Sequence, residues 1–283
     1  MNSNSAKLGY QRLEPTRTAR IATKATNEQR FWKKYINNVL TTTNGMIQSV
    51  CADANDSDLM LFAHGRNVIM VDSARNTIVR QIDHVENNVT ALAMREDGKL
   101  LALGDEVGLI EVKDTKEKFN LRSFSNHTKR INCLNFSNND LYSGGEDMVL
   151  RLYDVAAGEV VHSYANAHSD YIKCVRSLEN NLLLSGGYDG KVNLFDFRVH
   201  KAPQYVFEHG GQVEWLDVFP SKLNFVVCGE KKITSWDIRS QKPLFENISS
   251  KKLVSCVRVA SKGSRIISSS YDNYLKVYKT DTF

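Results

Sequence analysis

Short runs of alternating apolar and polar residues recur along the chain from about residue 46 to residue 279. Successive side chains of a β-strand point to opposite faces of a sheet, so this alternation predicts half-buried strands and not helices. Glycine and asparagine separate the runs at positions that suit hairpin turns, as in the turn from Tyr188 to Lys191. The pattern predicts an all-β chain built from hairpins.

The strand-like runs are grouped into units, and an aspartate closes most of the units. These aspartates are Asp72, Asp114, Asp154, Asp196 and Asp237, and Lys279 occupies the same phase in a sixth unit. The spacing of about 41 residues is typical of repeats with four strands to a blade, which bury their faces by packing radially. We expect inner strands to begin near Ile47, Val89, Ile131, Ile172, Val213 and Val254, and polar fourth strands over residues 77–82 and 160–164, for example. The fold class predicted is a β-propeller with six recognisable blades.

The last unit stops soon after its third strand, so it needs an outer strand from elsewhere. Residues 35–42 lie just before the first inner strand and can supply it, which would remove two open sheet edges. The alternative is a seven-bladed relative with one blade missing or completed by a partner chain. The expected organisation is an arm over residues 1–34 followed by a propeller over residues 35–283.

Composition narrows the class of protein further. Hydrophobic residues make up 42% of the 283 positions and charged residues 24%, which suits a globular body. The sequence has neither a long apolar membrane span nor the apolar core of a signal peptide near its start, so we expect an intracellular, soluble protein. The five cysteines contain no CxxC pair, and Cys133, Cys174 and Cys256 recur at one phase of the repeat. Buried thiols on inner strands explain these three better than disulfides or zinc ligands.

The excess positive charge lies in the first 45 residues. They hold eight basic and two acidic residues, a net charge of +6, while the remainder of the chain has a net charge of −1. This distribution favours an extended arm that contacts an acidic partner, and a solvated tail is the alternative. Phe31 and Trp32, which follow a capping-box spacing, are expected to anchor the arm on the propeller. The candidate phosphate or partner contacts are Arg17, Arg20, Lys24, Arg30, Lys33 and Lys34, with the pairs Lys231–Lys232 and Lys251–Lys252 as secondary candidates.

Polar residues also recur at fixed places in the units. His127, Ser143 and Asp147 of the third unit correspond to His168, Ser185 and Asp189 of the fourth, while the fifth keeps His209 and Trp236 and lacks the turn aspartate. This pattern resembles that of the WD-repeat family over residues 46–279. The resemblance implies that these side chains form a buried hydrogen-bonded network that ties the connection between blades to the hairpin.

A serine, a histidine and an aspartate could also form a hydrolytic triad, but a catalytic set is needed once and this set recurs in successive units. The glycines of residues 104–108 and of Ser185–Gly187 are expected to be hairpin glycines, because no GKS or GKT follows them. No metal-binding or nucleotide motif is present. The sequence predicts a protein that is not an enzyme and has no cofactor, small-molecule substrate or membrane partner.

Four segments in order, residues 26–35, 97–102, 168–173 and 187–190, resemble nucleolar WD-repeat proteins of the small-subunit processome. The resemblance implies a scaffold in the nucleus and nucleolus that contacts other processome WD-repeat proteins and the leader of precursor ribosomal RNA, in support of rRNA transcription and processing. Those relatives continue into a helical C-terminal domain, so a chain ending at Phe283 is expected to be a shortened version. The alternative is a general protein-interaction propeller, such as a signalling or ubiquitin-ligase adaptor, with no role on RNA.

Overall fold

The computed structural model describes residues 46–52, 59–75, 77–82, 85–116, 119–178, 181–199, 203–248 and 250–280. Within these ranges the chain forms six antiparallel sheets, and the one helical element among them is the short 3-10 turn Ser261–Gly263. The described residues contain no helix with the length and apolar character needed to cross a membrane. The prediction of an all-β chain is confirmed.

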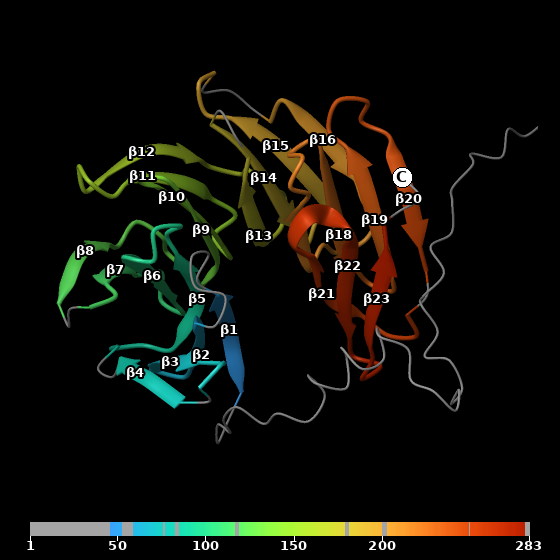
Figure 1. Cartoon of the computed structure of the whole chain (residues 1–283). Coiled ribbons are helices and arrows are strands. Elements are labelled where there is room, and N and C mark those ends of the chain that lie inside the picture. Colours follow the sequence, from blue (N-terminus) through green and yellow to red (C-terminus); the bar gives the residue numbers. More distant parts are fainter. Residues whose placement is uncertain are drawn as a thin grey trace, which may run out of the picture. The chain divides into compact units, whose positions relative to one another are not determined.

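The first of two compact units ends at Ala167 and carries three four-stranded sheets (Figure 1). Within each sheet, strands that follow one another in the chain pair with one another. The first sheet holds β1 (Ile47–Ala52), β2 (Leu59–His64), β3 (Asn67–Asp72) and β4 (Thr77–Ile82). The second holds β5 (Val89–Met94), β6 (Leu100–Asp105), β7 (Ile110–Asp114) and β8 (Asn120–Phe124), and the third holds β9 (Ile131–Ser137), β10 (Asp140–Gly145), β11 (Leu150–Asp154) and β12 (Glu159–Tyr164).

The second compact unit begins at His168 and repeats the same pattern. Its first sheet holds β13 (Ile172–Ser177), β14 (Leu182–Gly187), β15 (Lys191–Asp196) and β16 (Tyr205–Glu208). The next holds β17 (Trp215–Val218), β18 (Asn224–Gly229), β19 (Lys232–Asp237) and β20 (Pro243–Asn247), and the last holds β21 (Val254–Val259), β22 (Arg265–Ser270) and β23 (Leu275–Lys279).

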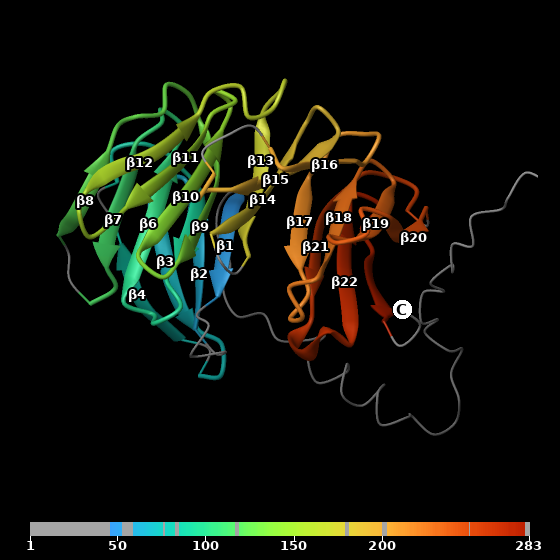
Figure 2. The same cartoon turned by 90° about the horizontal axis from the view of Figure 1, so that it is seen from above.

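Burial falls from the inner to the outer strand in the second sheet. In the second sheet, five of the six residues of β5 are buried, whereas four of the five residues of β8 are exposed. The inner strands β1, β5 and β9 lie side by side (Figure 1), and Figure 2 shows the same sheets from above. The inner strand β5 is therefore largely apolar on both faces, while the outer strand β8 tolerates the polar residues that the sequence shows there.

Apolar clusters fill the space between neighbouring sheets of each unit. Between the second and third sheets, Ile110 and Phe124 pack with Ile131 and Tyr153. The rings of Phe124 and Tyr153 lie 4.6 Å apart between centroids at a tilt of 49°. Removing such side chains from water is the main stabilising term, at about 25 cal/mol per Å² of apolar area. A single sheet cannot bury both of its faces, so the blades depend on one another for stability.

The periodic aspartates share one structural role in the turn after the third strand of a blade. Each accepts a hydrogen bond from a backbone N–H two or three residues further on, which is the Asx-turn arrangement. The donor–acceptor distances are 2.9 Å at Asp72, 2.7 Å at Asp114, 2.8 Å at Asp154, 3.0 Å at Asp196 and 2.8 Å at Asp237. The aspartates that recur most visibly in the sequence therefore stabilise the turn after the third strand of each of these blades.

Two details differ from the sequence-based expectation. Strand β17 begins at Trp215 and not near Val213, because its pairing with β18 begins with Trp215 opposite Cys228. The Val213 N–H instead donates to the Gly187 carbonyl of the preceding sheet at 3.1 Å. Gly186 and Gly187 belong to strand β14 and not to the hairpin turn, where Gly190 has a φ of +80°. They are required by close packing, since a Cβ on Gly187 would lie 2.5 Å from Nδ1 of His168.

The last sheet has three strands within the described residues, as the sequence predicts for the final unit. Residues 35–42, the expected source of its fourth strand, lie outside the described residues, and so does the whole arm over residues 1–34. Closure of the last blade by residues 35–42 remains a proposal.

Candidate functional site

The recurring polar residues meet inside the third sheet. His127 lies in the connection before β9, Ser143 in β10 and Asp147 in the turn between β10 and β11. Nδ1 of His127 lies 2.9 Å from both carboxylate oxygens of Asp147, and Nε2 lies 2.5 Å from Oγ of Ser143. Arg151, which the sequence pattern did not single out, donates to the same carboxylate at 2.9 Å. The histidine thus joins the connection between blades to the hairpin of its own blade.

Burial and neighbouring groups shift the pKa values of Asp147 and His127 in this network. Burial alone would raise the pKa of Asp147, but the hydrogen bonds from His127 and Arg151 outweigh it and hold that pKa well below its usual range. Burial lowers the pKa of His127, with Asp147 opposing the shift. Nδ1 of His127 lies beside both the Asp147 carboxylate and Nη1 of Arg151, which is 2.6 Å away, while Nε2 faces the Ser143 hydroxyl.

The fourth sheet repeats the arrangement with His168, Ser185 and Asp189. Nδ1 of His168 lies 2.9 Å from Oδ1 of Asp189, and Nε2 lies 2.7 Å from Oγ of Ser185. The backbone N–H of Ser169 donates to the same carboxylate at 3.0 Å. Burial opposes ionisation of Asp189, and the hydrogen bond from His168 more than compensates, so its pKa is lowered.

The fifth sheet does not form the expected network within the described residues. His209 is buried, but neither of its ring nitrogens forms a well-aligned hydrogen bond there, and the indole N–H of Trp236 also lacks one. Val227 occupies the place of the serine and the turn carries Glu230 and Lys231, so no hydroxyl or aspartate is available. Trp236 instead packs edge-on against Phe207, with ring centroids 5.6 Å apart. The assignment of His209 and Trp236 to a hydrogen-bonded network is therefore wrong for this part of the chain.

The isolated histidine should make the stability of the protein depend on pH. Burial, and then the charge of Lys232, lower the pKa of His209 to about 4, below its usual value of about 6.5. The unfolded chain then binds an additional proton between these values, so the stability from neutral His209 is complete above pH ~6.5 and is lost as the pH falls toward ~4. We expect protonation of His209 to lower the free energy of unfolding by up to about 3 kcal/mol over this pH range. In urea titrations at successive pH values, the His209→Gln variant should show a weaker dependence of the free energy of unfolding on pH. An unchanged slope in that variant would contradict the assignment.

The serines of these networks are poorly placed for catalysis. Ser143 and Ser185 are each 0% exposed, and each is enclosed by its histidine and the strands of its own sheet. A nucleophile must reach a substrate from a cleft, so the same three residue types here serve to hold the fold.

A second polar cluster, which the sequence analysis missed, joins the inner strands of the second unit. Asp217 on β17 accepts from Nε of Arg176 on β13 at 3.3 Å and lies 3.5 Å from Nη1 of Arg258 on β21. Both guanidinium groups also lie over the ring of Trp215, at 5.0 and 5.7 Å from its centroid. Residues 176, 217 and 258 are spaced by 41, which is one repeat period. Charged residues that recur at the same position of successive inner strands could therefore have predicted this cluster from the sequence.

The candidate contact residues are only partly described. Arg17, Arg20, Lys24, Arg30, Lys33 and Lys34 lie outside the described residues. Of the secondary candidates, Lys231 and Lys232 follow β18, and Lys251 and Lys252 precede β21. The structure brings these two segments together, since the Val254 N–H donates to the Glu230 carbonyl at 2.6 Å.

The cysteines lie where the repeat phase predicted. Cys133, Cys174 and Cys256 occupy the inner strands β9, β13 and β21, the first two buried and the third half-buried, and all the described cysteines are free thiols. Burial raises the pKa of Cys174 to about 12, so this thiol is protonated and unreactive at neutral pH.

Comparison with known families defines the class of protein. Residues 16–139 match the family described as "Anaphase-promoting complex subunit 4 WD40 domain", and residues 158–196 and 242–279 match "WD domain, G-beta repeat". The solved chain described as "Crystal structure of RRP9 WD40 repeats" superposes with a TM-score of 0.78 at 18% identity, covering 86% of this chain and 78% of that one. The chain belongs to the WD-repeat family, and its six sheets are the blades of a WD-repeat β-propeller.

Several of the similar curated proteins carry the same name. The chain is 28% identical over 284 residues to the "U3 small nucleolar RNA-associated protein 15 homolog" of Xenopus tropicalis, covering 96% of this chain and 53% of that protein. It is 25% identical over 279 residues to "U3 small nucleolar RNA-associated protein 15" of Saccharomyces cerevisiae, covering 94% of this chain and 54% of that protein. The chain therefore spans about half the length of the curated relatives it matches.

Proposed function

We propose that this chain is a non-catalytic scaffold of the nucleolar small-subunit processome, where it binds the leader of precursor ribosomal RNA and other assembly proteins. The observation that carries the proposal is similarity to proteins named as U3 small nucleolar RNA-associated over 94–96% of this chain. These names associate the relatives with a nucleolar RNA, and the proposed location of this chain is the nucleolus.

A scaffold role agrees with the chemistry of the described site. The polar networks are buried and repeated, and they fix the connections between blades instead of opening onto a substrate cleft. Rigid blades present their loops in fixed positions, which reduces the ordering cost of binding a large partner. The proposal therefore assigns binding, and no chemical step, to the propeller.

RNA association is assigned to the basic arm. Deleting residues 1–34 removes eight basic and two acidic residues. If the six candidate cations contact phosphates of a single strand, log K should fall with log salt at a slope of about −4 in the intact chain. We expect the deletion to weaken binding of a single-stranded leader RNA and to bring the slope close to zero, measured by fluorescence anisotropy over a salt series.

The matched variant keeps the arm and replaces Arg17, Arg20, Lys24, Arg30, Lys33 and Lys34 with glutamine. It should behave like the deletion if charge is responsible, while circular dichroism should show an unchanged β-sheet signal in both variants. RNA binding that keeps its affinity and salt slope in both folded variants would refute the role of the arm.

A second candidate function is a protein-interaction adaptor with no role on RNA. It is favoured by the match of residues 16–139 to a domain described from an anaphase-promoting complex subunit. Under this alternative the intact chain binds leader RNA no better than an unrelated RNA, and its arm contributes only a weak, unspecific attraction.

A further inference from the structure

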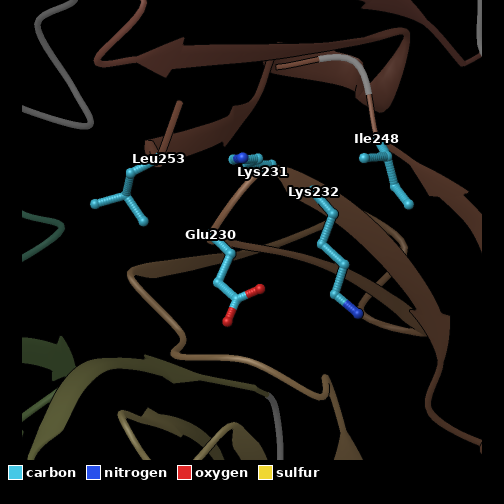
Figure 3. Close-up of a pocket in the computed structure, with 5 residues that line it drawn as sticks. All are labelled: Glu230, Lys231, Lys232, Ile248 and Leu253. Carbon is cyan, nitrogen blue, oxygen red and sulfur yellow. The ribbon is translucent and has the colours of Figure 1, made fainter. Parts of the chain in front are cut away.

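A hollow of ≈ 480 Å³ lies between the last two sheets of the second unit, lined by Glu230, Lys231, Lys232, Ile248 and Leu253. Its size is within the range of pockets that bind small ligands or enclose a side chain. Figure 3 shows Leu253 and Ile248 on opposite sides of the opening, with the three charged residues between them. Glu230 and Lys231 lie in the turn between β18 and β19, and Lys232 begins β19. The connection between β20 and β21 supplies the aliphatic residues.

The apolar part of this surface is exposed to solvent. Ile248 is 66% exposed although it lines the hollow, and Tyr271 on the neighbouring turn is 62% exposed. The Tyr271 N–H donates to the Leu253 carbonyl at 2.9 Å, so the turn that carries the tyrosine is bonded to the segment that lines the hollow. Large exposed apolar side chains that gather at a hollow indicate an interaction site more often than isolated ones do.

The charge around the hollow is positive. Lys232 is paired with Glu246 at 3.5 Å, but within the described residues Lys231, Lys251 and Lys252 form no ion pair, and all three are exposed. Lys251 and Lys252 directly precede Leu253 in the same connection. Three cations beside one lining carboxylate, Glu230, give a surface that attracts acidic groups.

The hollow is held in place by hydrogen bonds to both sheets. On one side the Val254 N–H donates to the Glu230 carbonyl at 2.6 Å. On the other side the Lys251 N–H donates to Asp272 Oδ2 at 3.2 Å, and Nζ of Lys276 donates to Ser250 Oγ at 3.1 Å. A surface that is ordered before binding loses little entropy when a partner arrives.

We propose that this hollow binds an acidic segment of a partner protein. One bulky apolar side chain of the segment enters between Ile248 and Leu253, where it removes apolar area from water. Flanking Asp or Glu residues lie over Lys231, Lys251 and Lys252. Proteins that bind single-stranded RNA generally stack successive bases on several aromatic side chains, whereas none of the five lining residues is aromatic and Tyr271 is a single ring on the neighbouring turn, so a peptide fits this hollow better than RNA does.

The test begins with a display library of short random peptides panned against the full chain. Selected peptides should share one large apolar residue close to two or more acidic ones. No enrichment of such peptides would overturn the proposal. A selected peptide is then measured by fluorescence polarisation against Ile248→Asp and against the double variant Lys251→Glu with Lys252→Glu, and each should bind about tenfold more weakly.

The matched control is Lys242→Glu, since Lys242 is an exposed lysine in the turn between β19 and β20, at the opposite end of the same sheet. Its affinity for the peptide should change by roughly twofold at most, as expected for a remote surface charge. Equal weakening by Lys242→Glu, or full affinity in Ile248→Asp, would contradict the site. Oligouridine that binds more tightly than the peptide and is weakened by the same lysine changes would show a phosphate site instead. Thermal melting establishes that all variants are folded.

Discussion

Asp147→Ala should destabilise the protein by about 3 kcal/mol, because it leaves the buried His127 and the largely buried Arg151 without their shared carboxylate. The pKa of Asp147 is lowered by those two donors, so the carboxylate is charged at neutral pH and its removal strands a positive charge. The free energy of unfolding in urea at pH ~7 is the measurement.

Asp154→Ala is the matched control in the same blade. Asp154 accepts two backbone N–H bonds at the surface, from Ala156 at 2.8 Å and Ala157 at 3.0 Å, and it has no buried cation to strand. The Asp154→Ala substitution should lower the free energy of unfolding by about 1 kcal/mol, as for an ordinary turn hydrogen bond. Equal losses in the two variants would mean that the buried network contributes no more than a turn, against this account of the fold.

Gly229→Ala should destabilise the protein by about 3 kcal/mol or more, since overpacking against backbone cannot be relieved by a rotamer change. An added Cβ would overlap the carbonyl oxygen of Gln212, which belongs to the connection before β17. The connection would have to move away from the turn between β18 and β19, which also forms the hollow. Thermal melting and soluble yield are the readouts.

Gly158→Ala is the comparison for this substitution. Gly158 has a φ of +80°, but the nearest atoms to an added Cβ belong to the flexible side chain of Arg122. The free energy of unfolding of Gly158→Ala should fall by about 1 kcal/mol, the usual cost of a side chain in the left-handed region. A Gly229→Ala protein as stable as Gly158→Ala would show that the connection before β17 is not tightly held.

Most of the fold could be predicted because the same strand and turn patterns recur in each repeat of the sequence. Asp72, Asp154 and Asp237 mark the same turn, and five of the six inner strands begin at the expected residue. The exception is β17: Val213 is fully buried like a strand residue, but pairing with β18 begins only at Trp215, and the apolar pattern does not show which buried residues are paired.

The site was harder to predict for a similar reason. The residues of the networks around His127 and His168 repeat in the sequence, but the fifth unit keeps only the histidine, His209. Without the hydroxyl and the turn aspartate, its ring nitrogens have no side-chain partner of the kind found in the other two networks. The hollow is lined by residues 230–232 on one segment and by Ile248 and Leu253 on another about twenty residues later, and the lysine pairs of these segments look like ordinary loop charges in the sequence. Only the packing of neighbouring sheets shows that Ile248 and the lysines share one surface.

The proposed RNA binding and the proposed peptide binding at the hollow depend on different parts of the molecule. RNA association is assigned to the basic arm, whereas the acidic peptide is assigned to a hollow between the last two sheets. A scaffold that joins an RNA to a protein needs two such surfaces. Variants at Ile248 should therefore leave RNA binding unchanged, and charge removal in the arm should leave peptide binding unchanged.

The central claim is that this WD-repeat propeller acts on precursor ribosomal RNA. It is tested most directly by crosslinking the intact chain in cells, recovering it under stringent washing and sequencing the attached RNA. The account predicts enrichment of the leader of the ribosomal RNA precursor over a control propeller without a basic arm, and loss of that enrichment when residues 1–34 are deleted. Equal recovery of leader RNA by the two propellers would contradict it.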